Sequence, residues 1–280
     1  MSTAGQDPVA RVRATFDAVA DDYDQSGVAF FGPAALGLLE ALAPQPGERA
    51  LDLGCGRGAV TTGLARAVLP SGTVEAVDLS PAMVAHTSAL LAREGLDARV
   101  RVMDAADPDL PAGSFDLVAS ALVLFFLPDP AAALARWVRL LAPGGRIGLT
   151  TFGAEHPAAA EVNALFRPWL PPAMLDPKAM GPDDPFASDA GMEALLAGAG
   201  ATDVRTVTRR VPVVYGDVEG WKAFSMSTGQ RMMWALVPEA ERDGLLARAA
   251  DILDGARDGT GRVVSWQDMR YTLGRAPAAG

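Results

Sequence analysis

A short glycine-rich segment between two apolar stretches is the first part of the chain whose residue types could bind a ligand. It reads LDLGCGRG over residues 51–58, and Gly54 and Gly56 carry no Cβ, so a ligand could approach the backbone closely. A helix that follows such a loop presents backbone N–H groups at its N-terminus. The G-x-G-x-G spacing differs from the G-x-G-x-x-G fingerprint of dinucleotide sites, and a plain tight turn is the alternative interpretation.

Two aspartates further along the chain strengthen this signal. Asp78 ends a strand-like segment at 73–78, and Asp104 follows another at 98–102. Because the carboxyl ends of parallel strands meet at one edge of a sheet, both should lie beside the glycine segment, where Asp78 could accept both hydroxyls of a ribose. Each aspartate taken alone could equally be a turn residue or a cap. Three such features at three consecutive strand ends indicate a ligand site.

Alternating strands and helices must position these groups. Strands are predicted at 49–53, 73–78, 98–102, 114–120 and 146–151. The helix after the second strand should begin with Ser80 as N-cap and Pro81 as first residue, and another at 130–141 should stop at Pro143-Gly144-Gly145. This order predicts an α/β doubly wound core with a mainly parallel sheet.

The regular alternation stops after residue 152. A helix is predicted at 192–199, strands at 203–215 and 263–273, and an uninterrupted helical stretch at 218–257. Two strands separated by so long a helical stretch indicate an insertion that caps the sheet.

Composition excludes several classes of function. The 280 residues include 24 Lys+Arg against 34 Asp+Glu, a net charge of −10, which argues against nucleic acid as a partner. One cysteine and two histidines leave no basis for a disulfide framework or a metal centre. With no signal-like apolar segment and no apolar run long enough to span a membrane, we expect a cytoplasmic protein that does not bind membranes. It should be a monomer or a homodimer.

Five segments carry a resemblance to a known family: FDAVADDYD (16–24), LDLGCGRGAV (51–60), VEAVDLSPAMV (74–84), VMDAADPDLPAGSFDLVAS (102–120) and RLLAPGGRIGLTTF (139–152). Together they resemble the motifs of class I S-adenosylmethionine-dependent methyltransferases, of the type that includes quinone-biosynthesis and many natural-product enzymes. The resemblance implies a Rossmann-like, seven-stranded, mostly parallel sheet of order 3-2-1-4-5-7-6, with the last strand antiparallel and helical lid insertions.

A single domain over residues 1–280 is therefore expected. It would comprise an N-terminal helical lid at 1–45, a cofactor-binding core at 46–152, and substrate-lid insertions at 153–190 and 217–261.

The resemblance also assigns a set of residues to the cofactor S-adenosylmethionine: Tyr23, Asp52, Gly54, Gly56, Asp78, Leu79, Met83, Asp104, Ala105 and Ser120. The glycines would pack against the methionine moiety, Asp52 would reach its ammonium, and Asp78 would hold the ribose hydroxyls. Leu79 and Met83 would flank the adenine, Asp104 would accept from its amino group and Ala105 would donate from its backbone. Ser120 would lie near the methionine portion, and Tyr23 would close over the cofactor from the lid. Carboxylates suit a cofactor that carries an ammonium and a sulfonium.

The reaction itself requires alignment of a nucleophile with the methyl group, and a base only if the nucleophile is a weak acid. Phe125 and Phe126 stand where relatives often carry a histidine, so an obvious base is missing there. His156, after the fifth strand, is the candidate catalytic base, with a solvated loop histidine as the alternative.

Candidate substrate residues are Phe30, Phe126, Trp221, Arg231 and Trp234. The aromatic and methionine side chains of the helical insertion would form the lid's own core, and some would also face an apolar substrate. Arg231 could pair with an acidic substrate oxygen or with a surface carboxylate.

The predicted function is transfer of a methyl group to O or C of a small apolar or aromatic specialised metabolite. The alternatives are a non-methylating cyclisation or rearrangement on the same fold, and a cofactor-binding pseudoenzyme.

Overall fold

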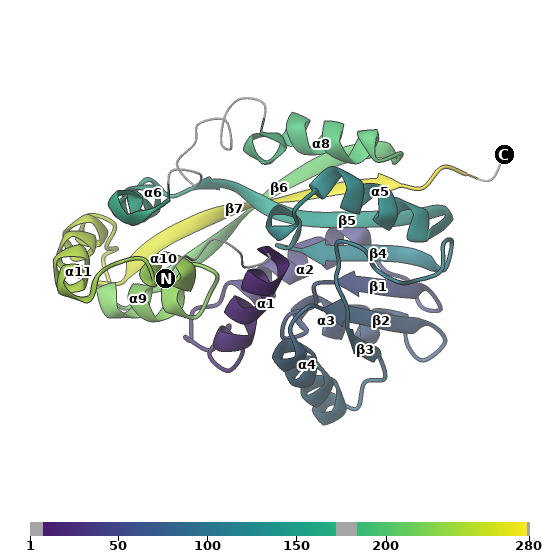
Figure 1. Ribbon diagram of the computed structural model, residues 1–280, viewed down its shortest axis with the longest axis horizontal. Helices are drawn as coiled ribbons and strands as arrows, with labels where there is room; N and C mark the ends of the chain where they lie inside the picture. The colour runs from purple at the N-terminus through teal and green to yellow at the C-terminus, as the bar shows by residue number, and fades with distance from the viewer. Residues whose placement is uncertain (1–7, 172–183, 279–280) are drawn as a thin grey trace, which may run out of the picture.

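A seven-stranded sheet runs through the centre of the computed structural model, which describes residues 8–171 and 184–278 (Figure 1). Its strands are β1 (Arg49–Leu53), β2 (Thr73–Asp78), β3 (Arg99–Val102), β4 (Phe115–Ala121), β5 (Leu141–Glu155), β6 (Thr202–Tyr215) and β7 (Val263–Arg275). The spatial order is β3-β2-β1-β4-β5-β7-β6; the pairs among β1 to β5 are parallel, and β7 is antiparallel to both of its neighbours. The predicted fold class and strand order are confirmed.

The helices surround this sheet: α1 (Pro8–Val19), α2 (Phe31–Leu42), α3 (Ala59–Val68), α4 (Pro81–Glu94), α5 (Pro130–Leu140), α6 (Pro157–Ala164), α8 (Asp189–Gly198), α9 (Val218–Met226), α10 (Arg231–Trp234) and α11 (Glu239–Asp254). Short 3-10 turns occur at Leu124–Phe126, Arg167–Trp169 and Pro185–Ala187. Within the described parts of the chain, no helix combines the length and the apolar character needed to cross a lipid bilayer.

Side-chain alternation along the buried strands divides the core between the two faces of the sheet. In β1, Ala50 packs with the buried residues of α2 and α3, whereas Leu51 and Leu53 pack with those of α5 and α8. Successive strand side chains point to opposite faces, so Asp52 lies on the same face as Ala50, toward α3. The strand alternation therefore determines where this carboxylate points.

Local signals fix most element boundaries. Ser80 caps α4 by accepting a hydrogen bond from the Met83 N–H at 3.1 Å, with Pro81 at the first position, as predicted. Two boundaries were predicted wrongly. Helix α5 ends at Leu140, and β5 begins at Leu141, so Pro143-Gly144-Gly145 lies inside an irregular part of the strand rather than in a loop.

The stretch 218–257 is likewise three helices rather than one. The hydroxyls of Ser227 and Thr228 donate to the Phe224 and Ser225 carbonyls at 2.8 and 3.1 Å, which ends α9 by competing with the backbone hydrogen bonds. Pro238 precedes the first residue of α11, where a proline is tolerated.

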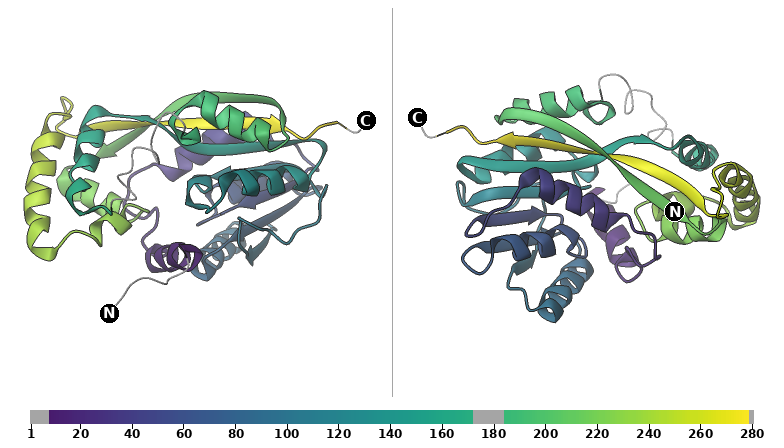
Figure 2. Two further views of the ribbon diagram at one scale, coloured as in Figure 1. Left: turned by 45° about the horizontal axis from the view of Figure 1, so that its top comes forward. Right: turned by 180° about the vertical axis from the view of Figure 1, so that it is seen from behind.

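Strands β5, β6 and β7 are longer than the others and project beyond the parallel part of the sheet. Helices α6, α9, α10 and α11 gather at this projecting end, and α1 lies between them and α4 (Figures 1 and 2). Residues of α1, of these three strands and of α6, α9 and α10 line a common cavity.

Helix α2 provides a matched test of the core. Leu38 is fully buried among residues of the sheet and α3, whereas Leu36 on the same helix is 56% exposed. We expect Leu38→Ala to lower the free energy of unfolding by about 2–5 kcal/mol and Leu36→Ala by less than about 1 kcal/mol in urea denaturation. Equal losses would show that α2 does not pack as described.

Candidate active site

The glycine-rich loop joins β1 to α3 and is built from left-handed backbone. Gly54, Gly56 and Gly58 have φ of +77°, +53° and +88°. A Cβ on Gly54 would lie 2.3 Å from Cγ2 of Val123, whereas one on Gly56 would meet nothing within 4 Å. The Gly54 and Cys55 N–H groups donate to the Val77 carbonyl at 2.8 and 3.0 Å, which ties the loop to β2. Gly56 therefore leaves open space where a ligand could contact the backbone.

Asp52 is a carboxylate almost completely removed from water. It is 1% exposed, and its Oδ2 accepts a hydrogen bond from the Thr61 hydroxyl at 2.6 Å. Burial raises the pKa of Asp52 to about 7, the Thr61 hydrogen bond opposes the rise, and the charge of Asp78 adds to it. A cation placed beside Asp52 would favour its ionised form.

Asp78 organises the adjoining backbone. Its Oδ2 accepts from the Gly56 N–H at 2.8 Å and its Oδ1 from the Ser80 N–H at 2.9 Å. Burial is the largest influence on Asp78 and raises the pKa of its carboxyl despite these hydrogen bonds. An ionised carboxylate has about four lone-pair positions, so capacity remains for further donors.

The other residues predicted at this edge lie where the strands end. Asp104 accepts from the Ala106 N–H at 2.8 Å, and the buried Ala105 carbonyl accepts from the Trp137 indole at 2.7 Å. The Ser120 hydroxyl donates to the Leu53 carbonyl at 2.9 Å, which links β4 to β1. Leu79, half-buried, directly follows Asp78.

The N-terminal segment covers this edge of the sheet. Val19 and Ala20 are buried against Met83, with Phe16 and Tyr23 packed around them. The Ser80 hydroxyl donates to Asp17, and the Arg57 guanidinium donates to the Ala20 and Asp21 carbonyls. Burial, with the charges of Asp24 and Asp78 adding to it, raises the pKa of Tyr23. The predicted cofactor residues Tyr23 and Met83 are thus brought to the glycine loop and Asp78.

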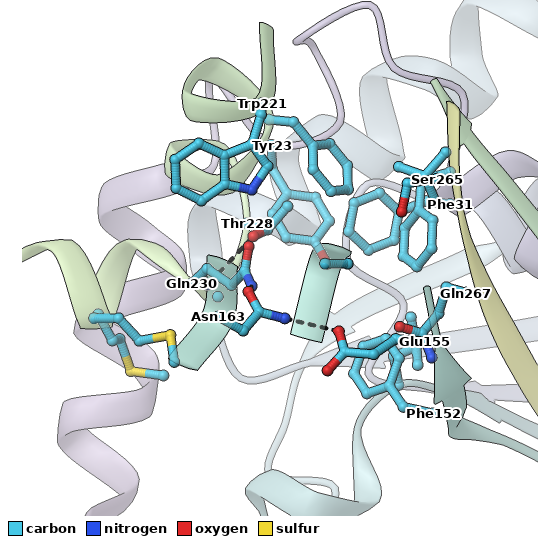
Figure 3. A pocket seen from close by; sticks show the side chains of 18 of the residues that line it. Tyr23, Phe31, Phe152, Glu155, Asn163, Trp221, Thr228, Gln230, Ser265 and Gln267 are labelled. Atoms are coloured by element: carbon cyan, nitrogen blue, oxygen red, sulfur yellow. Dashed lines mark hydrogen bonds between the residues drawn. The ribbon is translucent and has the colours of Figure 1, made fainter. Parts of the chain in front are cut away.

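A cavity of about 450 Å³ opens beside the end of β4, next to the glycine loop. Leu122 lines it and is followed by Val123, which contacts Gly54. Aromatic rings form a large part of the wall, among them Phe16, Phe30, Phe126 and Phe224. Figure 3 shows Tyr23, Phe31 and Trp221 in this wall. The volume is that of a site for a small organic ligand.

Polar side chains also line this cavity: Glu155, Asn163, Thr228, Gln230, Ser265 and Gln267 (Figure 3). Asn163 Nδ2 donates to Glu155 Oε2 at 2.8 Å, and Gln230 Nε2 donates to Asn163 Oδ1 at 2.9 Å. Burial raises the pKa of Glu155, opposed by the Asn163 hydrogen bond, and the charge of Glu155 adds to the burial that raises the pKa of Tyr215. The cavity thus contains one carboxylate in largely aromatic surroundings.

Three residues predicted to act on the substrate lie elsewhere. His156 caps α6, where its Nδ1 accepts from the Ala158 N–H at 3.2 Å, and its ring packs edge-on against Trp266. Arg231 lies 3.7 Å from Asp22 in an ion pair between α10 and the N-terminal segment. Trp234 is buried and donates to the Ser225 hydroxyl at 2.8 Å. Phe30, Phe126 and Trp221 do line the cavity.

Sequence reasoning missed Glu155, Asn163 and Gln230. Glu155 directly precedes His156, and the histidine was predicted as the base because it follows the fifth strand. A signal was present, since adjacent residues of a strand point to opposite faces and Glu155 ends β5. Asn163 and Gln230 are 67 positions apart and carry no local pattern that links them.

Known proteins are similar to this chain over most of its length. Residues 51–149 match the family model described as "Methyltransferase domain". The chain is 36% identical over 279 residues to nocamycin O-methyltransferase of Saccharothrix syringae, covering 95% of this chain and 98% of that protein. It is 38% identical over 167 residues to an aklanonic acid methyltransferase of Streptomyces sp. (strain C5), covering 59% and 76%.

Solved structures share the fold at low sequence identity. Phosphoethanolamine N-methyltransferase 2 of Haemonchus contortus, in complex with S-adenosyl-L-methionine, superposes with a TM-score of 0.61 at 18% identity, covering 99% of this chain and 61% of that one. The YcgJ protein of Bacillus subtilis gives 0.58 at 17% identity, covering 88% and 99%.

The pKa of Asp52 predicts how stability depends on pH. Its folded-state value of about 7 exceeds the ordinary 3.8, so the folded protein retains a proton that the unfolded chain releases, and stability falls as the pH rises from about 4 to about 7. Asp52→Asn keeps an oxygen for the Thr61 hydroxyl but carries no charge. We expect the variant to exceed the wild type by roughly 2–4 kcal/mol in free energy of unfolding near pH 8, without added ligand.

The difference between the two proteins should shrink as the pH falls toward about 4 and vanish below it, because Asp52 is then protonated in both the folded and the unfolded state. Asp251→Asn, at an exposed position on α11, is the control and should change stability equally little at both pH values. If the difference in free energy of unfolding between Asp52→Asn and the wild type does not depend on pH, the raised pKa of the buried Asp52 carboxyl is contradicted.

Proposed function

Because this chain belongs to the S-adenosylmethionine-dependent methyltransferases, we propose that its acceptor is an oxygen or carbon of a small apolar or aromatic specialised metabolite. The observation that carries the proposal is the aromatic cavity of about 450 Å³ beside the glycine loop. The names of two relatives, a nocamycin O-methyltransferase and an aklanonic acid methyltransferase, support a small specialised metabolite, and the first supports oxygen as the acceptor.

The residues at the sheet edge fit the cofactor chemically. Asp52 and Asp78 are carboxylates with raised pKa values, and no cation is among the causes that act on them, so a cationic ligand would compensate for their burial. We assign Asp52 to the cofactor ammonium, Asp78 to the ribose hydroxyls, and Gly54 and Gly56 to the methionine moiety.

The remaining cofactor assignments follow the same edge. Leu79 and Met83 would flank the adenine, Asp104 and the Ala105 backbone would hydrogen-bond its edge, and Ser120 would lie near the methionine portion. Tyr23 would close over the cofactor, since it packs with Met83 and also lines the cavity.

When bound, the cofactor supplies an activated methyl group. The chain's own contribution is positioning and exclusion of water: the cavity wall orients the acceptor, and the segment around Phe16 and Tyr23 covers the edge from solvent. His156 as general base remains a prediction. We further expect a cytoplasmic protein, active as a monomer or homodimer, that binds neither nucleic acid nor membranes.

Transfer of a labelled methyl group tests the proposal. Incubation with S-adenosylmethionine labelled in its methyl group and a panel of polycyclic aromatic metabolites should give an O- or C-methylated product by mass spectrometry, with S-adenosylhomocysteine in equal amount. A cyclisation or rearrangement on this fold, or a pseudoenzyme, would give a product without label or no product at all. Either result would refute the proposed function.

Asp78→Ala tests the ribose assignment. Loss of charge-assisted hydrogen bonds should weaken S-adenosylhomocysteine binding by about 1–3 kcal/mol, measured by calorimetry. Asp251→Ala on the exposed face of α11 is the control and should bind as the wild type does. Unchanged affinity in Asp78→Ala would remove Asp78 from the cofactor site.

A further inference from the structure

Glu155 is a half-buried carboxylate in a cavity whose lining residues, within the part of the chain that the structure describes, include no lysine, arginine or histidine. The other ionisable groups among them are the phenols of Tyr23 and Tyr215. A carboxylate in apolar surroundings loses hydration and gains little from aromatic walls. A ligand that restores a hydrogen bond to it would therefore be favoured over one that does not.

The amides behind Glu155 determine what kind of ligand group it can meet. Gln230 Nε2 donates to Asn163 Oδ1 at 2.9 Å, and Asn163 Nδ2 donates to Glu155 Oε2 at 2.8 Å, so both donors point toward the carboxylate (Figure 3). Among the described residues, Oε2 accepts from Asn163, and no donor contacts Oε1. The oxygen that remains available is an acceptor, and it lies on a group that lines the cavity.

These three residues come from three separate elements. Glu155 ends β5, Asn163 lies in α6, and Gln230 directly precedes α10 and has its own N–H held by the Thr228 hydroxyl at 3.2 Å. The chain of amides fixes the orientation of the Asn163 amide that holds Glu155 Oε2, because turning either amide over would place two donors or two acceptors against each other.

We propose that Glu155 binds a hydroxyl group of the acceptor substrate through Oε1, with Asn163 and Gln230 as positioning residues. The enzyme therefore selects neutral hydroxylated aromatic substrates over analogues that carry an ether or a carboxylate in place of the hydroxyl. An ether has no proton to donate to Glu155. A carboxylate would face a second carboxylate without a cation in the cavity wall. Burial raises the pKa of Glu155, which makes its ionised form a stronger hydrogen-bond acceptor.

The inference rests on the proposed function, since it names the substrate class of that same cavity. The test measures the binding of 2-naphthol, 2-methoxynaphthalene and 2-naphthoate in the presence of S-adenosylhomocysteine. Binding is measured by the quenching of tryptophan fluorescence. Trp221 and Trp266 line the cavity and supply the signal. At about pH 8 the naphthol is neutral, because phenols ionise near pH 10.

The wild type should bind 2-naphthol about tenfold or more tightly than either other probe, the difference expected for a hydrogen bond to a charged group. Glu155→Gln should reverse the preference. The new amide must turn its oxygen toward the Asn163 donor and its NH₂ toward the cavity, so 2-naphthoate should become the tightest ligand. Asn163→Ala should lower the naphthol preference several-fold without reversing it.

Ser265→Ala is the matched control, since Ser265 lines the same cavity outside the amide chain, and it should retain the naphthol preference. Binding of S-adenosylhomocysteine, measured by calorimetry, checks that each variant is folded. For the wild type, the same measurement tests the cofactor site independently of Glu155. A wild type that does not bind 2-naphthol, or that binds the methoxy compound or the naphthoate as tightly, overturns the proposal. A Glu155→Gln variant that still binds 2-naphthol most tightly also overturns the proposal.

Discussion

The removal of the Asp52 and Asp78 carboxylates from water is the constraint on which the rest of the site depends. Both lie at the carboxyl ends of central strands, where burial raises their pKa values and hydroxyl or backbone N–H groups compensate only in part. Gly56 leaves room beside them, Gly54 lets Val123 pack against the loop, and the N-terminal segment covers the same edge. The fold therefore holds a pair of acidic groups in a state that favours a cation, which is the charge that S-adenosylmethionine carries.

The length of β5 connects this edge to the cavity. The strand contributes Leu149 and Thr150 to the buried sheet and then continues to Glu155 in the cavity wall. Its partner β7 is comparably long and returns from the helical insertion, so this wall of the cavity is a continuation of the sheet. A group placed on such a rigid strand is held more precisely than one on a loop. The edge that carries the glycine loop and the cavity wall are thus parts of one continuous framework.

How much could be predicted from the sequence depended on whether the signal was local. The parallel strands, the Ser80 cap and the carboxylates at the strand ends follow from residue patterns within a few positions. The end of α9 could not be predicted in this way, because the hydroxyls of Ser227 and Thr228 end the helix through hydrogen bonds that the helical pattern of the sequence does not indicate. His156 was favoured because it follows the fifth strand, but β5 continues as far as its neighbour Glu155, and Glu155 is the residue that lines the cavity. The Arg231–Asp22 ion pair joins segments so distant in the chain that only the tertiary fold brings them together.

Phe16 and Tyr23 belong to the cover over the edge of the sheet that carries the glycine loop and to the wall of the aromatic cavity at the same time. The carbonyls of Ala20 and Asp21, held by Arg57, anchor this shared cover to the glycine loop. One displacement of the segment would therefore expose both compartments together. A ligand bound at the glycine loop and one bound in the cavity would then leave through a common opening, and breaking the Arg57 hydrogen bonds would be a step of that release.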